Sequence, residues 1–408
     1  MYSKSKSIFS IAVAVAALGY FVDIYDLLLF GIIRMPSLES LGLDKVQVLN
    51  EGETIIMWQM MGLLIGGIIW GVIGDKKGRL SVLFGSILLY SLANIANGFV
   101  QTVEQYKWIR FIAGLGLAGE LGAGITLVSE LVSKEKRGIA TSLVAGIGLT
   151  GAVFAFLIKQ NFEWRTCYFI GGGMGLLLLI LRVSVFESGL YYEVKESNVQ
   201  KGNFFSFFTN GERFKKYILN ILIGLPTWLI IGLLVTFSNE FGKAMDIKEK
   251  IDPGKAIMFA YVFISIGDVL IGFISNWLKS RKKALYIYYA ITILFIVLYF
   301  TIQWHGSANL MYFICAGLGF GTGFWAIFVT MAAEQFGTNL RATATTTIPN
   351  MVRGMLAIAI LPLFKLLRNY TTYYNAGCII AIIIMTISIY AVYKIEETFG
   401  KDLNFLEK

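Results

Sequence analysis

The sequence predicts an all-α polytopic membrane protein whose twelve transmembrane helices form two pseudo-symmetric six-helix bundles. Three observations lead to this fold class. The 408 residues are 56% hydrophobic and 15% charged, with a mean hydropathy of +0.69, whereas soluble domains are about half apolar and about a quarter charged. Twelve apolar runs are each long enough to cross a bilayer. The two halves of the chain also repeat the same loop motifs.

The apolar runs define the expected spans, because a spanning helix needs about 20 mostly apolar residues. The longest polar connector, 187–215, divides the runs six and six. We therefore expect an N-terminal bundle over 1–186, a central linker over 187–215 and a C-terminal bundle over 216–408. The expected spans cover residues 9–33, 53–74, 80–100, 106–132, 138–158, 167–186, 216–238, 255–277, 284–303, 308–332, 346–368 and 371–394.

The basic residues predict the orientation. With the N-terminus inside, the inside segments carry about twice as many Lys and Arg residues as the outside segments, which is the bias of cytoplasmic loops. We expect both termini and the linker to be cytoplasmic, in the inner membrane if the source is bacterial. The outside segment 239–254, "NEFGKAMDIKEKIDPG", mildly opposes the bias because it carries Lys243, Lys248 and Lys250.

Composition argues against several partners and cofactors. The net charge of +9 comes from short loops between apolar spans, so the sequence offers no basic face for nucleic acid. Cys167, Cys315 and Cys378 lie inside apolar runs, and the single histidine, His305, lies in an expected outer loop. Such spacing predicts no metal site and no organic cofactor. The expected partners are the lipid bilayer and a small-molecule substrate, with the protein a monomer.

Loop motifs recur in the two halves. Glu130 and Arg137 close the fourth span as "ELVSKEKRG", and Glu334 and Arg341 close the tenth as "EQFGTNLRA". The second span ends "GVIGDKKGR", and the eighth ends with a looser copy, "GFISNWLKSRKK". Paired six-helix halves with repeated loop chemistry are typical of secondary transporters, whose site lies near the midplane between the halves.

Several motifs carry a family resemblance. "GVIGDKKGRL" at 71–80, Arg110 with the glycine-rich run after it, "GYFVDIYDLLLFG" at 19–31 and "RVSVFES" stand in the order and positions of a known pattern. The chain resembles a major facilitator superfamily transporter of the metabolite–proton symporter and sugar-porter-like branch, over essentially its whole length. The resemblance implies transport by alternating access, with a proton as the coupling ion.

The chain departs from the family pattern at a few positions. Lys76 replaces the usual arginine, Gly189 stands where proline is typical, and Asn276 replaces the aspartate in the second copy of the loop motif. The fifth span lacks the proline common in exchangers, which disfavours antiport. These departures leave the substrate open.

Charges inside the spans predict the functional centre, because each costs at least about 2.5 kcal/mol at a helix centre. Asp23 and Asp26 share one face of the first span, and Arg110 lies at a similar depth in the fourth. We favour a carboxylate that binds a proton in one state and pairs with Arg110 in another. The alternative is a fixed Asp23–Arg110 or Asp26–Arg110 ion pair that only stabilises the bundle.

Three further charges lie within spans. Glu120 is either a functional group, as a second proton site or a contact to a substrate hydroxyl, or a protonated carboxylate that is hydrogen-bonded to a neighbouring helix. Asp268 and Arg353 lie at similar depth in the eighth and eleventh spans, so a structural ion pair is expected. The alternative is that Arg353 binds a substrate carboxylate, which suits a guanidinium group.

Polar and aromatic side chains within the spans are candidates for a small-molecule site, because pockets combine apolar walls with a few polar groups. Gln59 and Asn350 are the strongest, since amides that face lipid are unfavourable. For each of the others, packing or lipid contact is the favoured role and a place in the site is the alternative. The candidates are Tyr20, Tyr25, Trp58, Gln59, Asn94, Trp228, Trp325 and Asn350.

Charged residues at the expected cytoplasmic helix ends form a third group. The resemblance implies a network that holds the two halves together while the outside is open. Asp75 is also placed to cap a neighbouring helix N-terminus, where an acid is favoured. The alternative is a solvated set of charges that fixes topology. The gate candidates are Gly71, Asp75, Gly78, Arg79, Glu130, Arg137, Glu334 and Arg341.

The stretch "AGLGLAGELG" at 113–122 has the spacing of a dinucleotide-binding loop. It lies inside an apolar span without a preceding strand or turn, so the nucleotide interpretation fails its structural context. We expect the glycines to allow two helices to approach closely. "GLGFGTG" at 317–323 is the counterpart in the tenth span.

The sequence favours a proton-coupled symporter for a small organic acid. A sugar or polyol transporter, by symport or facilitated, is the alternative, and a transporter-shaped sensor without flux is a remote one. An enzyme is disfavoured because the sequence lacks HExxH, GxSxG, a Walker loop or a cysteine–histidine set.

Overall fold

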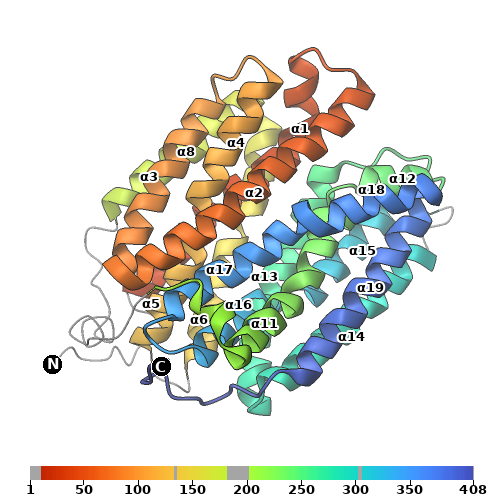
Figure 1. The fold of residues 1–408 in the computed structure, drawn as a ribbon. Coiled ribbons are helices and arrows are strands. Elements are labelled where there is room, and N and C mark those ends of the chain that lie inside the picture. The colour runs from red at the N-terminus through yellow and green to blue at the C-terminus, as the bar shows by residue number, and fades with distance from the viewer. Residues whose placement is uncertain (1–10, 133–135, 182–201, 302–305, 408) are drawn as a thin grey trace.

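The computed structural model describes residues 11–132, 136–181, 202–301 and 306–407. Within these ranges the protein is helical, and twelve helical stretches are long and apolar enough to cross a membrane. Figure 1 shows two bundles side by side, one red to yellow and the other green to blue. The predicted fold class is confirmed.

The first bundle holds six spans, of which the fourth and fifth each consist of two consecutive helices. Its described helices are α1 (Ile11–Ser40), α2 (Lys45–Lys77), α3 (Arg79–Asn97), α4 (Val103–Leu117), α5 (Glu120–Leu131), α6 (Arg137–Leu149), α7 (Gly151–Asn161) and α8 (Trp164–Leu181).

The second bundle also holds six spans, and two of them contain π-helical segments. Its described elements are α10 (Ser206–Thr209), α11 (Gly211–Leu229), the π segment η2 (Ile230–Val235), α12 (Ser238–Ala244), α13 (Pro253–Leu278), α14 (Arg281–Thr301), α15 (Ala308–Gly321), α16 (Trp325–Gln335), α17 (Arg341–Met355), the π segment η3 (Leu356–Ile360), α18 (Leu361–Tyr370) and α19 (Tyr373–Lys394).

Helix ends extend beyond the apolar runs where the sequence supplies a cap. Helix α2 begins at Lys45, before the expected residue 53, because Asp44 accepts hydrogen bonds from the amides of Val46 and Gln47. The Gln47 side chain accepts in turn from the Asp44 amide, at 3.0 Å, which completes a capping box. Hydropathy finds the membrane core of a helix, and capping residues fix where it starts.

The prediction that 113–122 contains no turn is wrong. Helix α4 ends at Leu117 and α5 begins at Glu120, so the fourth span breaks at the glycines. The tenth span breaks at the matching place, between Gly321 of α15 and Trp325 of α16. Glycine has low helix propensity, and broken helices are common at transporter sites. Two helix N-termini therefore start inside the protein interior.

Close packing by the same glycines is confirmed. A Cβ added at Gly114 would lie 2.2 Å from the Gln59 carbonyl oxygen of α2, and one added at Gly62 would lie 2.1 Å from the Phe111 oxygen of α4. In the second bundle a Cβ at Gly319 of α15 would lie 2.1 Å from the Ala260 oxygen of α13. Only glycine permits backbones this close.

The two bundles meet mainly where α2 packs against α17 and α6 packs against α13. We call the end that carries the C-terminal segment 395–407 the tail end, and the end that carries the turn 41–44 and α12 the opposite end (Figure 1). Any pathway between the bundles must open at one end or the other.

The α2–α4 packing makes a testable prediction. Gly114→Val should lower the free energy of unfolding by about 1–3 kcal/mol, because the added atoms overlap the α2 backbone. Thermal unfolding of the protein in detergent measures this change. Gly173→Val is the matched control, since nothing lies within 4 Å of a Cβ at that position in α8. Equal melting temperatures for the two variants would contradict the packing argument.

Candidate functional site

A fully buried ion pair lies inside the first bundle. Arg110 of α4 donates from Nη1 to Asp26 Oδ1 at 2.8 Å and from Nη2 to the Asp26 carbonyl oxygen at 3.0 Å. Both side chains are 0% exposed. Of the two pairs that the sequence allowed, the structure forms the one with Asp26.

Two candidate lining residues belong to this ion pair. Gln59 accepts from Arg110 Nε at 3.3 Å and donates to the Leu27 carbonyl oxygen at 2.9 Å, while Asn94 accepts from Arg110 Nη1 at 3.4 Å. The ring of Tyr168 lies 5.6 Å from the guanidinium carbon; sequence inspection missed this residue. The second carboxylate oxygen of Asp26 has no hydrogen-bond partner among the described residues, so a proton can bind there.

Arg353 lies at the boundary between the bundles. Its Nη1 donates to Asn350 Oδ1 at 3.2 Å, and its guanidinium carbon lies 5.7 Å from the Trp325 ring. Asn350 donates to the Ala118 carbonyl oxygen at 2.7 Å, which links α17 to the break in the fourth span. Three sequence-predicted site residues therefore lie together.

The expected ion pair between Asp268 and Arg353 is wrong for the described structure. Asp268 instead accepts from the Ala326 amide at 3.0 Å, and no ion pair joins it to Arg353. The break in the tenth span explains this choice, because the N-terminus of α16 presents free amides and its N-cap residue Phe324 makes no side-chain hydrogen bond.

Several buried groups converge near Arg353. Asp23, Tyr261 and Asp268 act electrostatically on the Tyr20 hydroxyl, as does Arg353. Asp23 stands one helical turn before Asp26, so α1 joins this group to the Arg110 pair. The polar atoms Arg353 Nε, Asp268 Oδ2 and Trp325 Nε1 are buried without a hydrogen-bond partner among the described residues. Buried polar atoms of this kind call for a ligand, an ion or water.

A small cavity lies between the bundles, lined by residues of α1, α2, α13 and the π segments η2 and η3. Its volume is about 20 Å³, and Gln59 and Trp228 are among its lining residues. About one water fits such a space. In the described conformation the two bundles therefore leave no room for a substrate at this cavity.

Two candidate lining residues lie elsewhere. Trp58 packs edge to face on Trp108 at 4.5 Å, and Trp108 is 50% exposed on the outer surface of α4. Tyr25 donates to the Cys167 carbonyl oxygen of α8 at 2.7 Å. Both side chains hold helices of one bundle together. Packing was the role that the sequence favoured for each of them, because hydropathy does not report which way a side chain points around a helix.

Asp75 closes the tail end. It accepts from the amides of Ala342 and Thr343 at 3.1 and 2.8 Å, and from the Thr343 hydroxyl at 2.6 Å. The α17 N-terminus has no side-chain cap of its own, so a carboxylate of the first bundle caps a helix of the second. Gly71 permits the contact, because a Cβ there would lie 3.1 Å from the Thr343 Cα.

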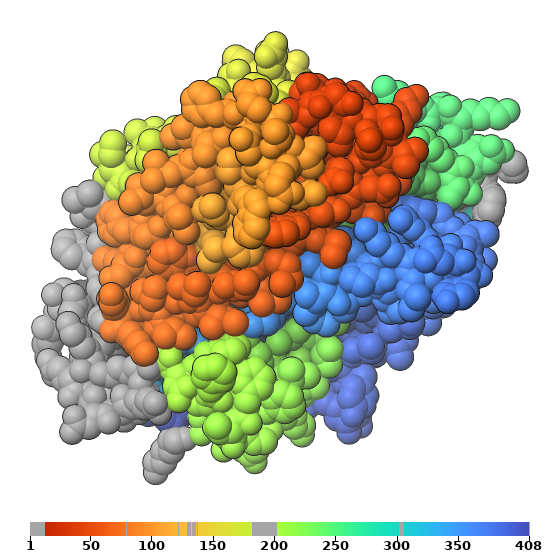
Figure 2. All heavy atoms as spheres, turned by 45° about the horizontal axis from the view of Figure 1, so that its top comes forward, coloured from red at the N-terminus to blue at the C-terminus, as the bar shows by residue number. Residues whose placement is uncertain are grey.

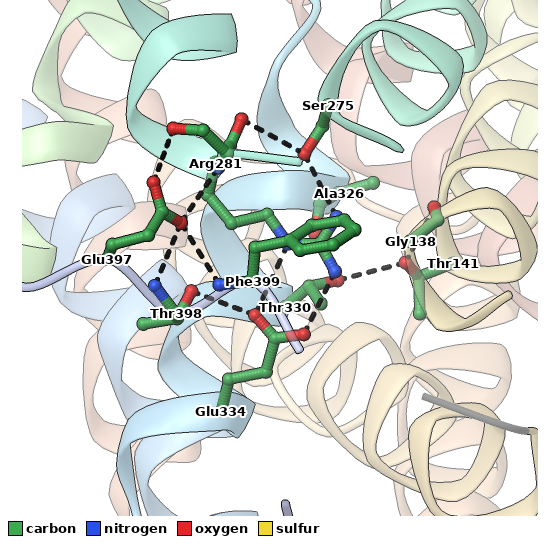
Figure 3. Close-up of polar contacts among 11 residues, drawn as sticks. Gly138, Thr141, Ser275, Arg281, Ala326, Thr330, Glu334, Glu397, Thr398 and Phe399 are labelled. Carbon is green, nitrogen blue, oxygen red and sulfur yellow. Dashed lines mark hydrogen bonds and ion pairs between the residues drawn. The ribbon is translucent and has the colours of Figure 1, made fainter. Parts of the chain in front are cut away.

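Figure 3 shows a second set of contacts at the tail end, around Arg281 and Glu334. Arg281 Nη2 lies 2.9 Å from Glu334 Oε1, and the Thr398 hydroxyl donates to Glu334 Oε2 at 2.8 Å. The ring of Phe399 lies 5.0 Å from the Arg281 guanidinium carbon. The gate candidate Arg341 also reaches the C-terminal segment, through a hydrogen bond to the Leu403 carbonyl oxygen. The C-terminal segment thus covers the charged helix ends.

Glu397 caps α14 in the same network. Figure 3 shows Glu397 beside Arg281, whose amide donates to it at 2.9 Å. Glu397 also accepts from the Lys282 amide at 3.3 Å and from the Ser280 hydroxyl. Burial alone would raise the pKa of the Glu397 carboxyl, but these hydrogen bonds and one from the Phe399 amide bring that pKa below its usual value. Glu397 is therefore ionised at neutral pH. Sequence inspection missed Arg281 and Glu397.

The remaining gate and coupling candidates are placed only in part. Gly78 has φ 100° between α2 and α3, where glycine is favoured. Glu120 is 1% exposed in the first turn of α5. The side chains of Arg79, Glu130 and Arg137 lie outside the described residues.

The opposite end is also closed by charges that sequence inspection missed. Arg34 Nη2 of α1 lies 3.4 Å from Glu240 Oε1 of α12. Glu53 of α2 is 1% exposed and lies 2.8 Å from Lys365 Nζ and 3.4 Å from Arg368 Nη1 of α18. Each of these pairs joins one bundle to the other, so the described conformation is closed at both ends.

The family follows from comparison with known proteins. The model of the Major Facilitator Superfamily matches residues 8–362. The chain belongs to this superfamily. It is similar to the niacin transporter NiaP of Acinetobacter baylyi, with 24% identity over 95% of this chain and 94% of that protein. It is also similar to the 3-(3-hydroxy-phenyl)propionate transporter of Escherichia coli K12, with 25% identity over 85% and 84% of the two chains.

A solved structure shares the fold. The proton:xylose symporter XylE bound to 6-bromo-6-deoxy-D-glucose matches with a TM-score of 0.77, 16% sequence identity and 98% coverage of both chains. The protein is therefore an integral multi-pass transporter of the Major Facilitator Superfamily and not an enzyme.

The Asp75 cap of this superfamily protein makes a prediction about closure. Asp75→Ala removes an N-cap worth about 0.5–2 kcal/mol, so the fraction open at the tail end should rise about 2- to 30-fold. Maleimide labelling of Thr330→Cys, with the three native cysteines replaced, measures this opening, because Thr330 is buried and bonds Thr141 across the boundary at 2.9 Å.

Asp44→Ala is the control for this experiment, because Asp44 caps only its own helix α2. Its labelling rate should equal that of the unmodified background. Equal labelling in the Asp75 and Asp44 variants would show that the Asp75 cap does not hold the bundles together.

Proposed function

We propose that the protein is a secondary active transporter that couples proton movement to symport of a small organic acid by alternating access. The tail end is the cytoplasmic end in this proposal, with both termini cytoplasmic and the protein in the inner membrane of a bacterial cell. The buried Asp26–Arg110 pair carries the proposal, because it holds a titratable carboxylate against a fixed cation inside the first bundle, next to Leu27 and Gln59 of the cavity wall.

Asp26 serves as the proton site. Removing one partner of a buried ion pair typically costs about 3–5 kcal/mol, because the other charge is left uncompensated. Protonation of Asp26 therefore drives Arg110 toward another anion or another arrangement of its neighbours. Gln59 also lines the central cavity, and it bonds Arg110 at 3.3 Å. Protonation of Asp26 is thus transmitted to Gln59 in the cavity wall through Arg110.

Arg353 serves as the substrate contact. It is buried at the boundary, its Nε has no hydrogen-bond partner among the described residues, and Trp325 lies against it. A guanidinium beside an aromatic ring suits a flat or aromatic carboxylate. The similar transporters are named for niacin and for 3-(3-hydroxy-phenyl)propionate, and both compounds are aromatic carboxylic acids. This agreement favours an organic acid over a sugar.

Proton coupling predicts the behaviour of Asp26→Asn. Wild-type protein in liposomes should accumulate a carboxylate from a panel of organic acids, sugars and amino acids when a proton gradient is imposed, and a protonophore should abolish accumulation. Asp26→Asn should reduce gradient-driven uptake to the level of protein-free liposomes, since an amide cannot titrate. Asp44→Asn, an exposed cap, is the control and should keep full uptake.

Two outcomes would contradict the proposal. Coupling is refuted if Asp26→Asn and Asp23→Asn both take up the acid at the wild-type level with the proton gradient abolished. The substrate class is refuted if the protein takes up only sugars.

Anion recognition predicts the behaviour of Arg353→Gln. Loss of a charged hydrogen bond worth about 1.5–3 kcal/mol should weaken equilibrium binding of the transported acid roughly 10- to 150-fold. Arg165→Gln is the control, because among the described residues Arg165 donates hydrogen bonds only to the carbonyl oxygens of Gly98 and Val100. Wild-type affinity in Arg353→Gln would assign the carboxylate contact to another residue.

A further inference from the structure

A large cavity opens at the opposite end, where the two bundles meet. Its volume is about 880 Å³, and we call it the outer vestibule. The end of α1, the start of α2 and Lys159 of α7 form one side, and α12 with its connection to α13 forms the other. Figure 2 shows the red segment of the α1–α2 turn next to the green segment of that connection. The vestibule is thus at the boundary that must open for alternating access.

Basic side chains predominate in the lining. Six basic residues and four acidic residues line the vestibule. Three of the acids already have partners: Glu240 pairs with Arg34, Asp252 caps α13 and lies 3.7 Å from Lys159, and Glu249 accepts from the Ala308 amide at 2.8 Å. The described structure shows no ion pair for the following lining residues: Lys45, Lys243, Lys248 and Lys250.

These lysines include the outside charges that topology does not explain. Loops on the outer side normally carry fewer Lys and Arg residues, yet the segment 239–254 concentrates them. A cleft lined by one sign of charge raises the local concentration and the association rate of an oppositely charged ligand by about 10- to 1,000-fold. The lining therefore favours an anionic ligand.

Arg34 supplies a buried anchor at the base of this lining. It is 1% exposed, it stacks on Phe237 at 4.8 Å, and a Cβ at Gly52 would lie 2.6 Å from its Cδ. Its Nη1 has no hydrogen-bond partner among the described residues, and its contact with Glu240 is long, at 3.4 Å. A guanidinium held this way can donate hydrogen bonds from two nitrogens to one carboxylate.

The vestibule also leads toward the centre. Gly31 lines both the outer vestibule and the small cavity beside Gln59 and Trp228. A Cβ at Gly31 would lie 3.5 Å from the Ile257 side chain of α13. The two cavities therefore lie one after the other along the boundary between the bundles.

We propose that the outer vestibule is a second binding site for an organic carboxylate, with Arg34 as its anchor. The bound carboxylate competes with Glu240 for Arg34, which removes one contact that closes the opposite end. The choice of ligand rests on the proposed function, and the location rests on the vestibule itself.

Equilibrium binding of radiolabelled benzoate to the full-length protein in nanodiscs tests the proposal. In Arg353→Gln, where the central contact is removed, a benzoate site should remain. Its affinity should fall about tenfold or more when ionic strength rises from about 10 to about 300 mM, because the Debye length falls from about 30 Å to below about 8 Å and the lysines are exposed to the salt. Adding Arg34→Gln should abolish this salt-sensitive site.

A second variant guards against misfolding of Arg34→Gln. Replacing Lys243, Lys248 and Lys250 together by glutamine changes only exposed side chains, and it should weaken the salt-sensitive site several-fold. Lys107→Gln is the matched control on the same side; Lys107 pairs with Glu51 at 2.9 Å and does not line the vestibule.

The proposal fails if the Arg353→Gln variant binds no benzoate, if its remaining site ignores salt, or if neither the arginine nor the lysine substitutions weaken it. Failure of the proposed function looks different. In that case wild-type protein shows no proton-driven uptake, while the salt-sensitive benzoate site persists and responds to Arg34→Gln.

Discussion

The transport account depends on the buried pair of Arg110 and Asp26. Neither side chain reaches solvent, so each charge must be compensated within the bundle. The neutral amides of Gln59 and Asn94 complete the hydrogen bonds of the guanidinium but cannot replace the anion. A proton on Asp26 therefore leaves Arg110 as an uncompensated cation close to the central cavity. In the proposed cycle, a proton neutralises the negative charge of Asp26, and the incoming carboxylate supplies the negative charge that the buried cations then lack. The proton and the acid therefore travel together.

A second constraint shapes the closed ends. Helices that begin inside the protein present free amides, and here carboxylates from distant elements satisfy them. Asp268 of α13 binds the start of α16, Asp75 of α2 binds the start of α17, and Glu397 binds the start of α14. The opposite end instead uses ion pairs such as Glu53 with Lys365. Across the boundary between the bundles, the tail end is therefore held by a helix cap and the opposite end by ion pairs.

Hydropathy and charge were sufficient to predict all twelve spans, their two bundles and the partnership of an aspartate in the first span with Arg110. They could not distinguish Asp26 from Asp23, because the two share a helical face and the rotation of α1 against α4 decides between them. The role of Trp58 was left open for the same reason: an apolar helix does not reveal which side faces lipid. Arg281 was taken as a topology charge, since its burial arises from Glu334 and the distant C-terminal segment. The α17 N-terminus did carry a usable signal, because its N-cap residue Leu340 cannot cap it.

Proton uptake on substrate binding tests the role of Asp26 most directly. The transported acid, added as its anion to purified protein in weakly buffered solution, should be bound together with a proton, which a pH indicator records as alkalinisation. Asp26→Asn should bind the acid without taking up the proton. Equal alkalinisation in wild-type protein and Asp26→Asn would contradict the account, because the coupling proton would then bind elsewhere.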